Sequence, residues 1–84
     1  MQVTLKLYAS LTDYLPPAHR VGNQMGLEVT TGATLNEVIA PFKLPAHMVH
    51  LVLVNGHFIA PEARAGHALA AGDVLAIWPP IAGG

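Results

Sequence analysis

The sequence predicts an α+β fold, in which a mixed and twisted sheet carries one main helix across one of its faces. Residues 2–8 alternate between apolar and polar side chains, as a strand with one buried face does. Residues 34–42 carry apolar side chains at helical spacing, and Asn55-Gly56 separates two short apolar runs in the manner of a hairpin. A single helix in a chain otherwise made of strands is expected to lie on one face of the sheet.

The composition indicates one small domain. The chain has 84 residues, of which 52% are hydrophobic and 11% charged, and its formal net charge is −1. Charged residues make up about a quarter of an average protein, so this composition argues against a disordered chain and against a nucleic-acid-binding protein. The scarcity of charge also predicts that some apolar surface stays exposed for a protein partner.

Membrane insertion and thiol chemistry are both unexpected. No apolar run approaches about 18 residues, and residues 1–15 lack a basic start followed by a continuous apolar stretch. We therefore expect a cytoplasmic protein without membrane contact. Cysteine is absent, which removes disulfides, thiolate metal sites and cysteine nucleophiles together. A role in sulfur or acyl chemistry would need a group other than a thiol side chain.

The first strand is expected over residues 2–8, and a short helical turn over residues 9–15. Pro16-Pro17 should end this turn, because proline lacks the N–H group that continues a helix. The side chains expected to point into the core from these two segments are Val3, Leu5, Leu7, Leu11, Tyr14 and Leu15.

An exposed loop is expected over residues 18–26, and a second strand over residues 27–30, paired with the first in a hairpin. Thr34 and Glu37 have the spacing of a capping box, which predicts a helix that begins there and runs to residue 42. Pro41 should disturb the end of this helix. The apolar side chains that would face the sheet are Leu35, Val38, Ile39 and Phe42.

The second half of the chain predicts three more strands. Residues 50–54 form an apolar run, Asn55-Gly56 predicts a tight turn, and residues 57–59 return as a short strand. Residues 60–72 are alanine-rich and interrupted by proline and glycine, so they predict an irregular segment. Residues 74–78 predict the last strand.

The end of the chain predicts an arm that carries a reactive group. Trp78 is expected to stay in the core, and Pro79-Pro80 should end the sheet pairing and direct the chain stiffly away from the domain. Gly83 and Gly84 have no Cβ atom, so they could pass through a channel too narrow for other residues. We expect residues 1–80 to form the domain and residues 81–84 a flexible tail that ends in the α-carboxylate of Gly84.

Two further groups of residues are weaker candidates. His47 and His50 are three residues apart, but Pro45 precedes them and no carboxylate completes a ligand set, so no metal site is expected. Phe58 and Ile59 are candidates for a partner surface, with packing in the core as an equal alternative.

These elements and the end of the chain resemble one family. A hairpin, a helix and strands that end in Gly72-Asp73, Pro79-Pro80 and Gly83-Gly84 are similar to the β-grasp sulfur carriers of the MoaD/ThiS type, which are relatives of ubiquitin. The resemblance covers nearly the whole chain and is most specific over residues 72–84 and 54–56. The proline pair before Ile-Ala-Gly-Gly resembles the small subunit of molybdopterin synthase more than the thiamine-pathway carrier.

The resemblance implies a β-grasp fold and a chemical role for the carboxylate of Gly84. In that family an adenylating, ubiquitin-activating-type enzyme uses ATP to activate the terminal carboxylate, and a sulfur donor converts it to a thiocarboxylate. The acceptor would be the large subunit of molybdopterin synthase or an equivalent enzyme. The chain would bind no cofactor itself and would act as a sulfur-carrying substrate and subunit. The tail that would enter the partner's channel consists of Pro79, Pro80, Ile81, Ala82 and Gly83.

The acceptor pathway stays open. Residues 18–26 form a longer loop than compact members have, and residues 61–72 are richer in alanine than usual, so a thiamine-pathway or a tRNA-thiolation carrier is an alternative. A ubiquitin-like modifier that forms isopeptide bonds through Gly84 is a second alternative. An interaction module with an inert tail is a third.

Overall fold

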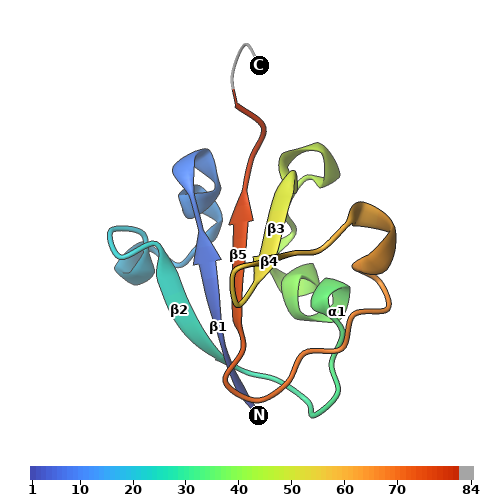
Figure 1. Cartoon of the computed structure of the whole chain (residues 1–84). Coiled ribbons are helices and arrows are strands. Elements are labelled where there is room, and N and C mark those ends of the chain that lie inside the picture. The colour runs from blue at the N-terminus through green and yellow to red at the C-terminus, as the bar shows by residue number, and fades with distance from the viewer. Residues whose placement is uncertain (82–84) are drawn as a thin grey trace.

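The computed structural model describes residues 1–81. Within this range five strands form one sheet, in the order β2-β1-β5-β3-β4. The strands and the α-helix are β1 (Gln2–Leu7), β2 (Gln24–Glu28), α1 (Leu35–Ile39), β3 (Leu51–Val54), β4 (His57–Phe58) and β5 (Val74–Trp78). Figure 1 shows these strands side by side, with α1 against one side of the sheet.

The sheet is mixed. β1 and β5 lie in its middle and run parallel, with Leu5 opposite Leu75. The other neighbouring pairs, β1 with β2, β3 with β5 and β3 with β4, are antiparallel. Parallel neighbours need a long crossover connection, and the whole chain between β1 and β5 supplies it. The predicted α+β class and the β-grasp architecture are confirmed.

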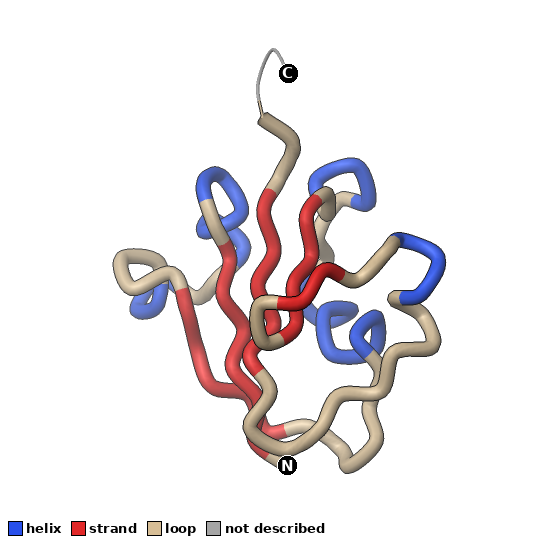
Figure 2. Tube along the Cα trace, in the orientation of Figure 1, coloured by secondary structure: helices blue, strands red, loops and turns tan. Residues whose placement is uncertain are grey.

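The core lies between the inner sheet face and α1. Alternation along β1 buries Val3, Leu5 and Leu7, because successive side chains of a strand point to opposite faces. The fully buried side chains from the rest of the chain are Leu11, Leu15, Leu35, Val52, Leu75 and Ile77. Figure 2 shows the helical segments flanking the sheet strands that supply this core.

The predicted capping box at the start of α1 is present. The Thr34 hydroxyl accepts a hydrogen bond from the Glu37 backbone N–H (3.3 Å), and the Glu37 carboxylate accepts one from the Thr34 N–H (2.9 Å). The α-helix ends at Ile39 and continues as the 3₁₀ turn Ala40–Phe42. Pro41 explains this change, since it cannot donate the i to i−4 hydrogen bond of a regular helix.

Short 3₁₀ turns fill most of the connections. They cover Ala9–Tyr14, Pro17–His19, Ala46–Met48 and Pro61–Ala63. Pro17 and Pro61 each occupy the first position of their turn, where the missing N–H costs no hydrogen bond. These turns hold the loops close to the ends of the strands.

Two expectations about the first half of the chain were wrong. The second strand begins at Gln24 and ends at Glu28, so it takes in the last three residues of the predicted loop and ends before the predicted strand does. Pairing of Leu5 with Met25 sets this register and outweighs the weak strand preference of Gly26. Tyr14 is 37% exposed, because Leu15, extended after the turn, takes the buried position instead.

In the part of the chain that the structure describes, no helix is both long enough and apolar enough to cross a membrane.

Candidate functional site

The segment Pro79–Ile81 leaves the sheet at the end of β5, at the opposite end of the molecule from residue 1 (Figure 1). The His50 N–H donates to the Trp78 carbonyl (3.2 Å) next to this exit. Pro79 and Pro80 have no N–H to continue the pairing. We call the residues Trp78–Ile81 the arm root. The predicted tail residues Ala82, Gly83 and Gly84 lie outside the described residues.

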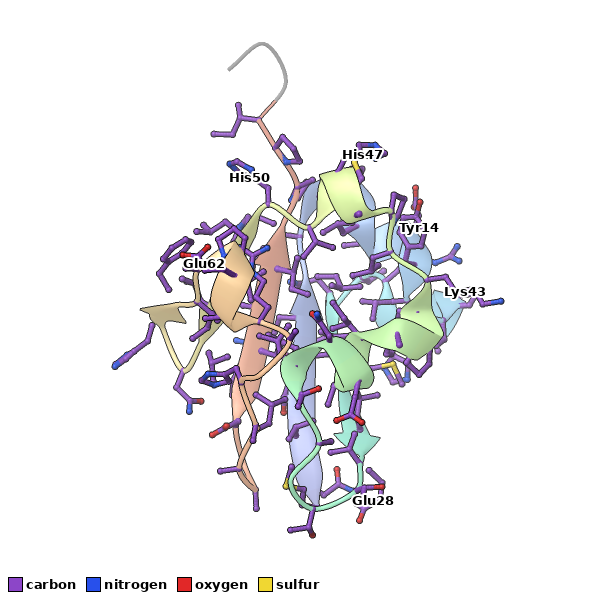
Figure 3. All side chains as sticks on the ribbon, turned by 90° about the vertical axis from the view of Figure 1, so that its right-hand side faces the viewer. Tyr14, Glu28, Lys43, His47, His50 and Glu62 are labelled. Atoms are coloured by element: carbon purple, nitrogen blue, oxygen red, sulfur yellow. The ribbon has the colours of Figure 1, made fainter. Side chains whose placement is uncertain are left out.

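A groove of about 470 Å³ lies beside the arm root. Figure 3 shows His50 close to the base of the projecting segment. The exposed fraction is 82% for Ile81 and 36% for Leu51, so both side chains present apolar surface to the outside. The groove is lined by His50, Leu51, Trp78, Pro79, Pro80 and Ile81. Most of these side chains are apolar, and such a surface favours contact with protein over contact with water.

A second apolar surface covers the sheet face that points away from α1. The pleat determines which residues lie there, because Leu7, Val52 and Ile77 are buried on the inner face and their neighbours point outward. Leu51 lies opposite Trp78, and Leu53 lies opposite Phe58. We call this surface the outer apolar face, and it consists of Tyr8, Leu51, Leu53, Phe58 and Trp78.

The Tyr8 and Trp78 rings join the outer apolar face to the arm root. Their centroids are 4.0 Å apart and their planes are inclined by 9°, which is a stacked arrangement. The Tyr8 N–H also donates to the Ile77 carbonyl (3.1 Å), so the backbone fixes the register of the two rings. A partner that covers this face therefore contacts the arm at the point where it leaves the domain.

The prediction that Trp78 lies in the core was wrong. The ring is only partly buried and belongs to the outer face. The alternation along β5 could have predicted this position. Leu75 and Ile77 point to the buried face, and Trp78, one residue further on, points to the opposite face. Tyr8, which stacks on Trp78, likewise follows the polar phase of β1 and was missed as a site residue.

The two candidates on the return strand have different environments. Phe58 is 58% exposed on the outer apolar face. Ile59 is partly buried and packs against the core, and its N–H donates to the Val52 carbonyl (2.9 Å). The structure thus places Phe58, but not Ile59, next to Leu53 on the outer apolar face.

A hydrogen-bonded network at the other end of β5 secures that strand. The Asp73 carboxylate accepts from the Ala70 N–H and from the Asn55 side-chain amide, both at 2.8 Å. Asn55 Oδ1 in turn accepts from the Val74 N–H (2.9 Å). The Ala70 N–H and the Asn55 amide hold the pKa of Asp73 below its ordinary value. The Asn55-Gly56 turn has the positive φ angles, 51° and 83°, that a tight hairpin requires.

The histidines do not assemble into a ligand set within residues 1–81. His47 lies in the turn Ala46–Met48, and His50 lies next to the arm root (Figure 3). No group of three His, Asp or Glu side chains that could hold a metal ion occurs in that range.

The site thus consists of an apolar sheet face, an aromatic stack and a projecting proline arm. Comparison with known families shows which family has this combination of features. The family model described as the ThiS family matches residues 16–84, which is most of the chain. The chain belongs to the ThiS family. It is a ubiquitin-like β-grasp protein of the MoaD/ThiS type, a group of sulfur carriers and modifiers.

Solved structures share the fold of this ThiS-family chain. It is 28% identical to SAMP1 from Haloferax volcanii, covering 100% of both chains with a TM-score of 0.66. The solution structure of the HVO 2177 protein, also from Haloferax volcanii, has 23% identity and a TM-score of 0.75, with 100% of this chain and 87% of that chain covered. A search of curated protein sequences gave no match.

One similar structure is a complex. A chain from the complex of subunits 1 and 2 of the molybdopterin-converting factor of Helicobacter pylori 26695 is 19% identical to this ThiS-family chain. Both chains are covered to 100%, and the TM-score is 0.62. At this identity the likeness shows the fold.

Proposed function

We propose that this ThiS-family chain carries sulfur as a thiocarboxylate on Gly84 and delivers it in molybdopterin biosynthesis. The observation that carries the proposal is the continuity of the outer apolar face with the Pro79-Pro80 arm, in a chain whose family model extends to Gly84. The proposal takes Gly84 as the C-terminal residue.

The chemistry follows from the weak reactivity of a carboxylate. One Gly84 carboxylate oxygen attacks the α-phosphorus of ATP, and pyrophosphate leaves. A sulfur nucleophile from the donor then attacks the acyl carbon, and AMP leaves with the bridging oxygen. When the donor is a persulfide, the product is an acyl disulfide, and a thiol of the donor system then attacks the donor's own sulfur, forming a disulfide with it and releasing the thiocarboxylate. An adenylating partner supplies the ATP site and the positioning, because this chain contributes the reacting carboxylate and the surface that presents it.

The apolar side chains on the sheet and the arm are suited to contact such a partner. Phe58 and Leu53 offer apolar contacts on the sheet, and Ile81 extends them along the arm. Buried aromatic side chains near the centre of an interface supply much of its binding energy. By analogy with the Helicobacter pylori complex of subunits 1 and 2, we propose that a large subunit receives the sulfur while it covers this surface.

A second candidate is a protein modifier, which the 28% identity to SAMP1, a small archaeal modifier protein, favours. In this case a lysine amine attacks the Gly84 adenylate, AMP leaves, the amine loses a proton, and an isopeptide bond forms. The thiamine branch is a third candidate, which the match to the ThiS family favours.

One experiment separates the carrier from the modifier. The protein is incubated anaerobically with its cognate adenylating enzyme, ATP and a sulfur donor, and its intact mass is measured. Replacement of one oxygen by one sulfur supports the carrier, whereas a conjugate to a second protein supports the modifier. An unchanged mass, with an adenylating enzyme shown to be active on another carrier, contradicts both.

Complementation then separates the pathways. The gene is expressed in strains that lack either the molybdopterin carrier or the thiamine carrier, and growth is measured under conditions that require each cofactor. We expect rescue of the molybdopterin-deficient strain. Rescue of the thiamine-deficient strain alone would overturn the assignment of the pathway and leave sulfur carriage intact.

A further inference from the structure

Arg64 is the one buried charged residue within residues 1–81, with 7% of its surface exposed. Its guanidinium group donates to three backbone carbonyls: Nε to Ile59 (3.1 Å), Nη1 to Val49 (3.1 Å) and Nη2 to His50 (3.0 Å). The donors sit on three separate nitrogens, which the planar guanidinium of arginine provides and the single ammonium nitrogen of lysine does not.

The positive charge of Arg64 is surrounded by carbonyl dipoles. Among the described residues no carboxylate lies within ion-pair distance of its guanidinium group. Burial lowers the pKa of Arg64, and the nearby charge of Glu62 opposes this shift. A buried cation without a paired anion is costly unless its hydrogen bonds are satisfied, so the geometry of the three carbonyls is tightly coupled to this side chain.

The three carbonyls belong to the two open ends of one short hairpin. Val49 and His50 precede β3, and Ile59 follows β4. β3 and β4 are joined by only two residue pairs, Leu53 with Phe58 and Val54 with His57. Arg64 therefore closes a hairpin whose own ladder is very short, and it lies in a segment that the sequence predicted to be irregular.

The same contact reaches the arm root. The His50 carbonyl accepts from Arg64, and the His50 N–H donates to the Trp78 carbonyl, directly before the two prolines. The turn Pro61–Ala63, which ends at Arg64, lies on the same side of the molecule as His50, as the position of Glu62 in Figure 3 shows. One side chain thus links the strand that carries Phe58 to the residue from which the arm projects.

The chain contains a natural control for this contact. Arg20 follows the turn Pro17–His19 as Arg64 follows Pro61–Ala63, and both residues have nearly the same backbone angles. Nε of Arg20 donates to the carbonyl five residues earlier, Leu15 (2.9 Å), as Nε of Arg64 does to Ile59. The other Arg20 contact, from Nη2 to the Asp13 carbonyl (3.1 Å), lies only seven residues away, so Arg20 has the same motif without any contact to the arm root.

We propose that Arg64 is a positioning residue, which fixes the arm root and the Phe58 strand relative to each other so that one partner can engage both. It acts through the His50 backbone. The activity test of this proposal rests on the proposed function, whereas the structural test, by hydrogen exchange, needs no partner protein.

The structural test compares R64K with R20K by amide hydrogen exchange of the whole protein. Lysine keeps the charge, but its donors share one nitrogen that cannot reach all three carbonyl positions of the guanidinium. In R64K the His50 amide should therefore exchange about tenfold faster, the effect of one weakened hydrogen bond. The Leu5 amide in the core should not change, and R20K should leave His50 unchanged. His50 exchange that stays at the wild-type rate, or that rises only in step with Leu5, overturns the proposal.

The activity test measures pyrophosphate release by the cognate adenylating enzyme with each variant as substrate, well below its melting temperature. We expect R64K to raise the KM for the carrier about fivefold with kcat within about twofold, because positioning changes binding of the arm more than the chemical step. R20K should behave as wild type. Unchanged KM and kcat in R64K overturn the positioning role.

Failure of the proposed function has a different signature. If Gly84 is not activated, the wild-type protein itself releases no pyrophosphate with the adenylating enzyme. If the chain is a modifier, pyrophosphate is released, but the intact-mass experiment gives a conjugate and no thiocarboxylate. The hydrogen-exchange comparison of R64K and R20K still decides whether Arg64 holds the arm root.

Discussion

Trp78 shows how a single residue changes role with its position in the pleat. Its ring lies on the outer apolar face and stacks on Tyr8, next to the point where the arm begins. An aromatic side chain placed there is available to a partner, and a core position would have hidden it. The residues proposed to contact a partner therefore point outward from strands whose inward-pointing residues build the core.

The stability of two variants on β5 tests this placement. Trp78→Ala should destabilise the protein by about 1–2 kcal/mol, from partial burial and the lost ring stack. Leu75→Ala should cost about 3–5 kcal/mol, because Leu75 is fully buried. Urea unfolding measured by circular dichroism gives both free energies. Fluorescence is unsuitable, because Trp78→Ala removes the one tryptophan in the sequence. Equal costs would return Trp78 to the core.

Asp73 gives a prediction for the dependence of stability on pH. Its pKa is lowered in the folded protein by the Ala70 N–H and the Asn55 amide, so the native state binds a proton less readily than the unfolded chain does. The stabilisation from Asp73 is fully present above the unfolded-state pKa and is lost as the pH falls through the folded-state pKa. The difference in unfolding free energy between wild type and Asp73→Asn should therefore shrink on acidification. A difference that stays constant from neutral to acidic pH would contradict this.

At the scale of elements, the sequence was sufficient wherever a local signal agreed with the packing. The Thr34 capping box, the Asn55-Gly56 turn and the alternation of β1 all occur as predicted. The start of β2 was missed, because Gly26 reads as loop and only pairing with β1 makes it a strand. The contacts of Arg64 could not be predicted either, since they join carbonyls up to 15 residues away through a segment without periodicity.

The start of α1 is testable as an element. Thr34→Ala removes the hydroxyl that accepts from the Glu37 N–H and should cost about 1 kcal/mol. Thr31→Ala is the matched control, because Thr31 is an exposed threonine before the helix. Chemical denaturation of both variants measures the difference. If the two substitutions cost the same, the capping box contributes nothing beyond the loss of a surface threonine.

At the scale of the whole molecule, the fold places the proposed partner surface on the sheet side and at one end. The outer apolar face, the stacked rings and the arm root follow one another from β4 across β3 to the exit of β5. This arrangement explains how a chain with few charges can present a partner with both a broad apolar contact and a thin projecting segment. The tail that follows Ile81 supplies the proposed reactive group, and the sequence alone predicts it.

Partner binding should depend on the outer apolar face. Phe58→Ser should weaken binding to the adenylating enzyme about tenfold or more, as loss of an aromatic contact near the centre of an interface does. Val21→Ser is the control, because Val21 is fully exposed in the loop before β2, the edge strand opposite to β4 and Phe58. Isothermal titration calorimetry with each variant gives the dissociation constants. Equal weakening by both substitutions, or by neither, would move the partner surface elsewhere.

The most direct test of sulfur carriage on Gly84 compares the wild-type chain with a variant that lacks Gly84. Both are treated anaerobically with the adenylating enzyme, ATP and a sulfur donor, and intact mass is measured beside the thermal unfolding of each. We predict one sulfur in place of one oxygen for the wild type and none for the variant. The stabilities should agree within about 0.5 kcal/mol, because the deletion leaves the domain untouched. A variant without Gly84 that still accepts sulfur would contradict the account, and the fold would stand.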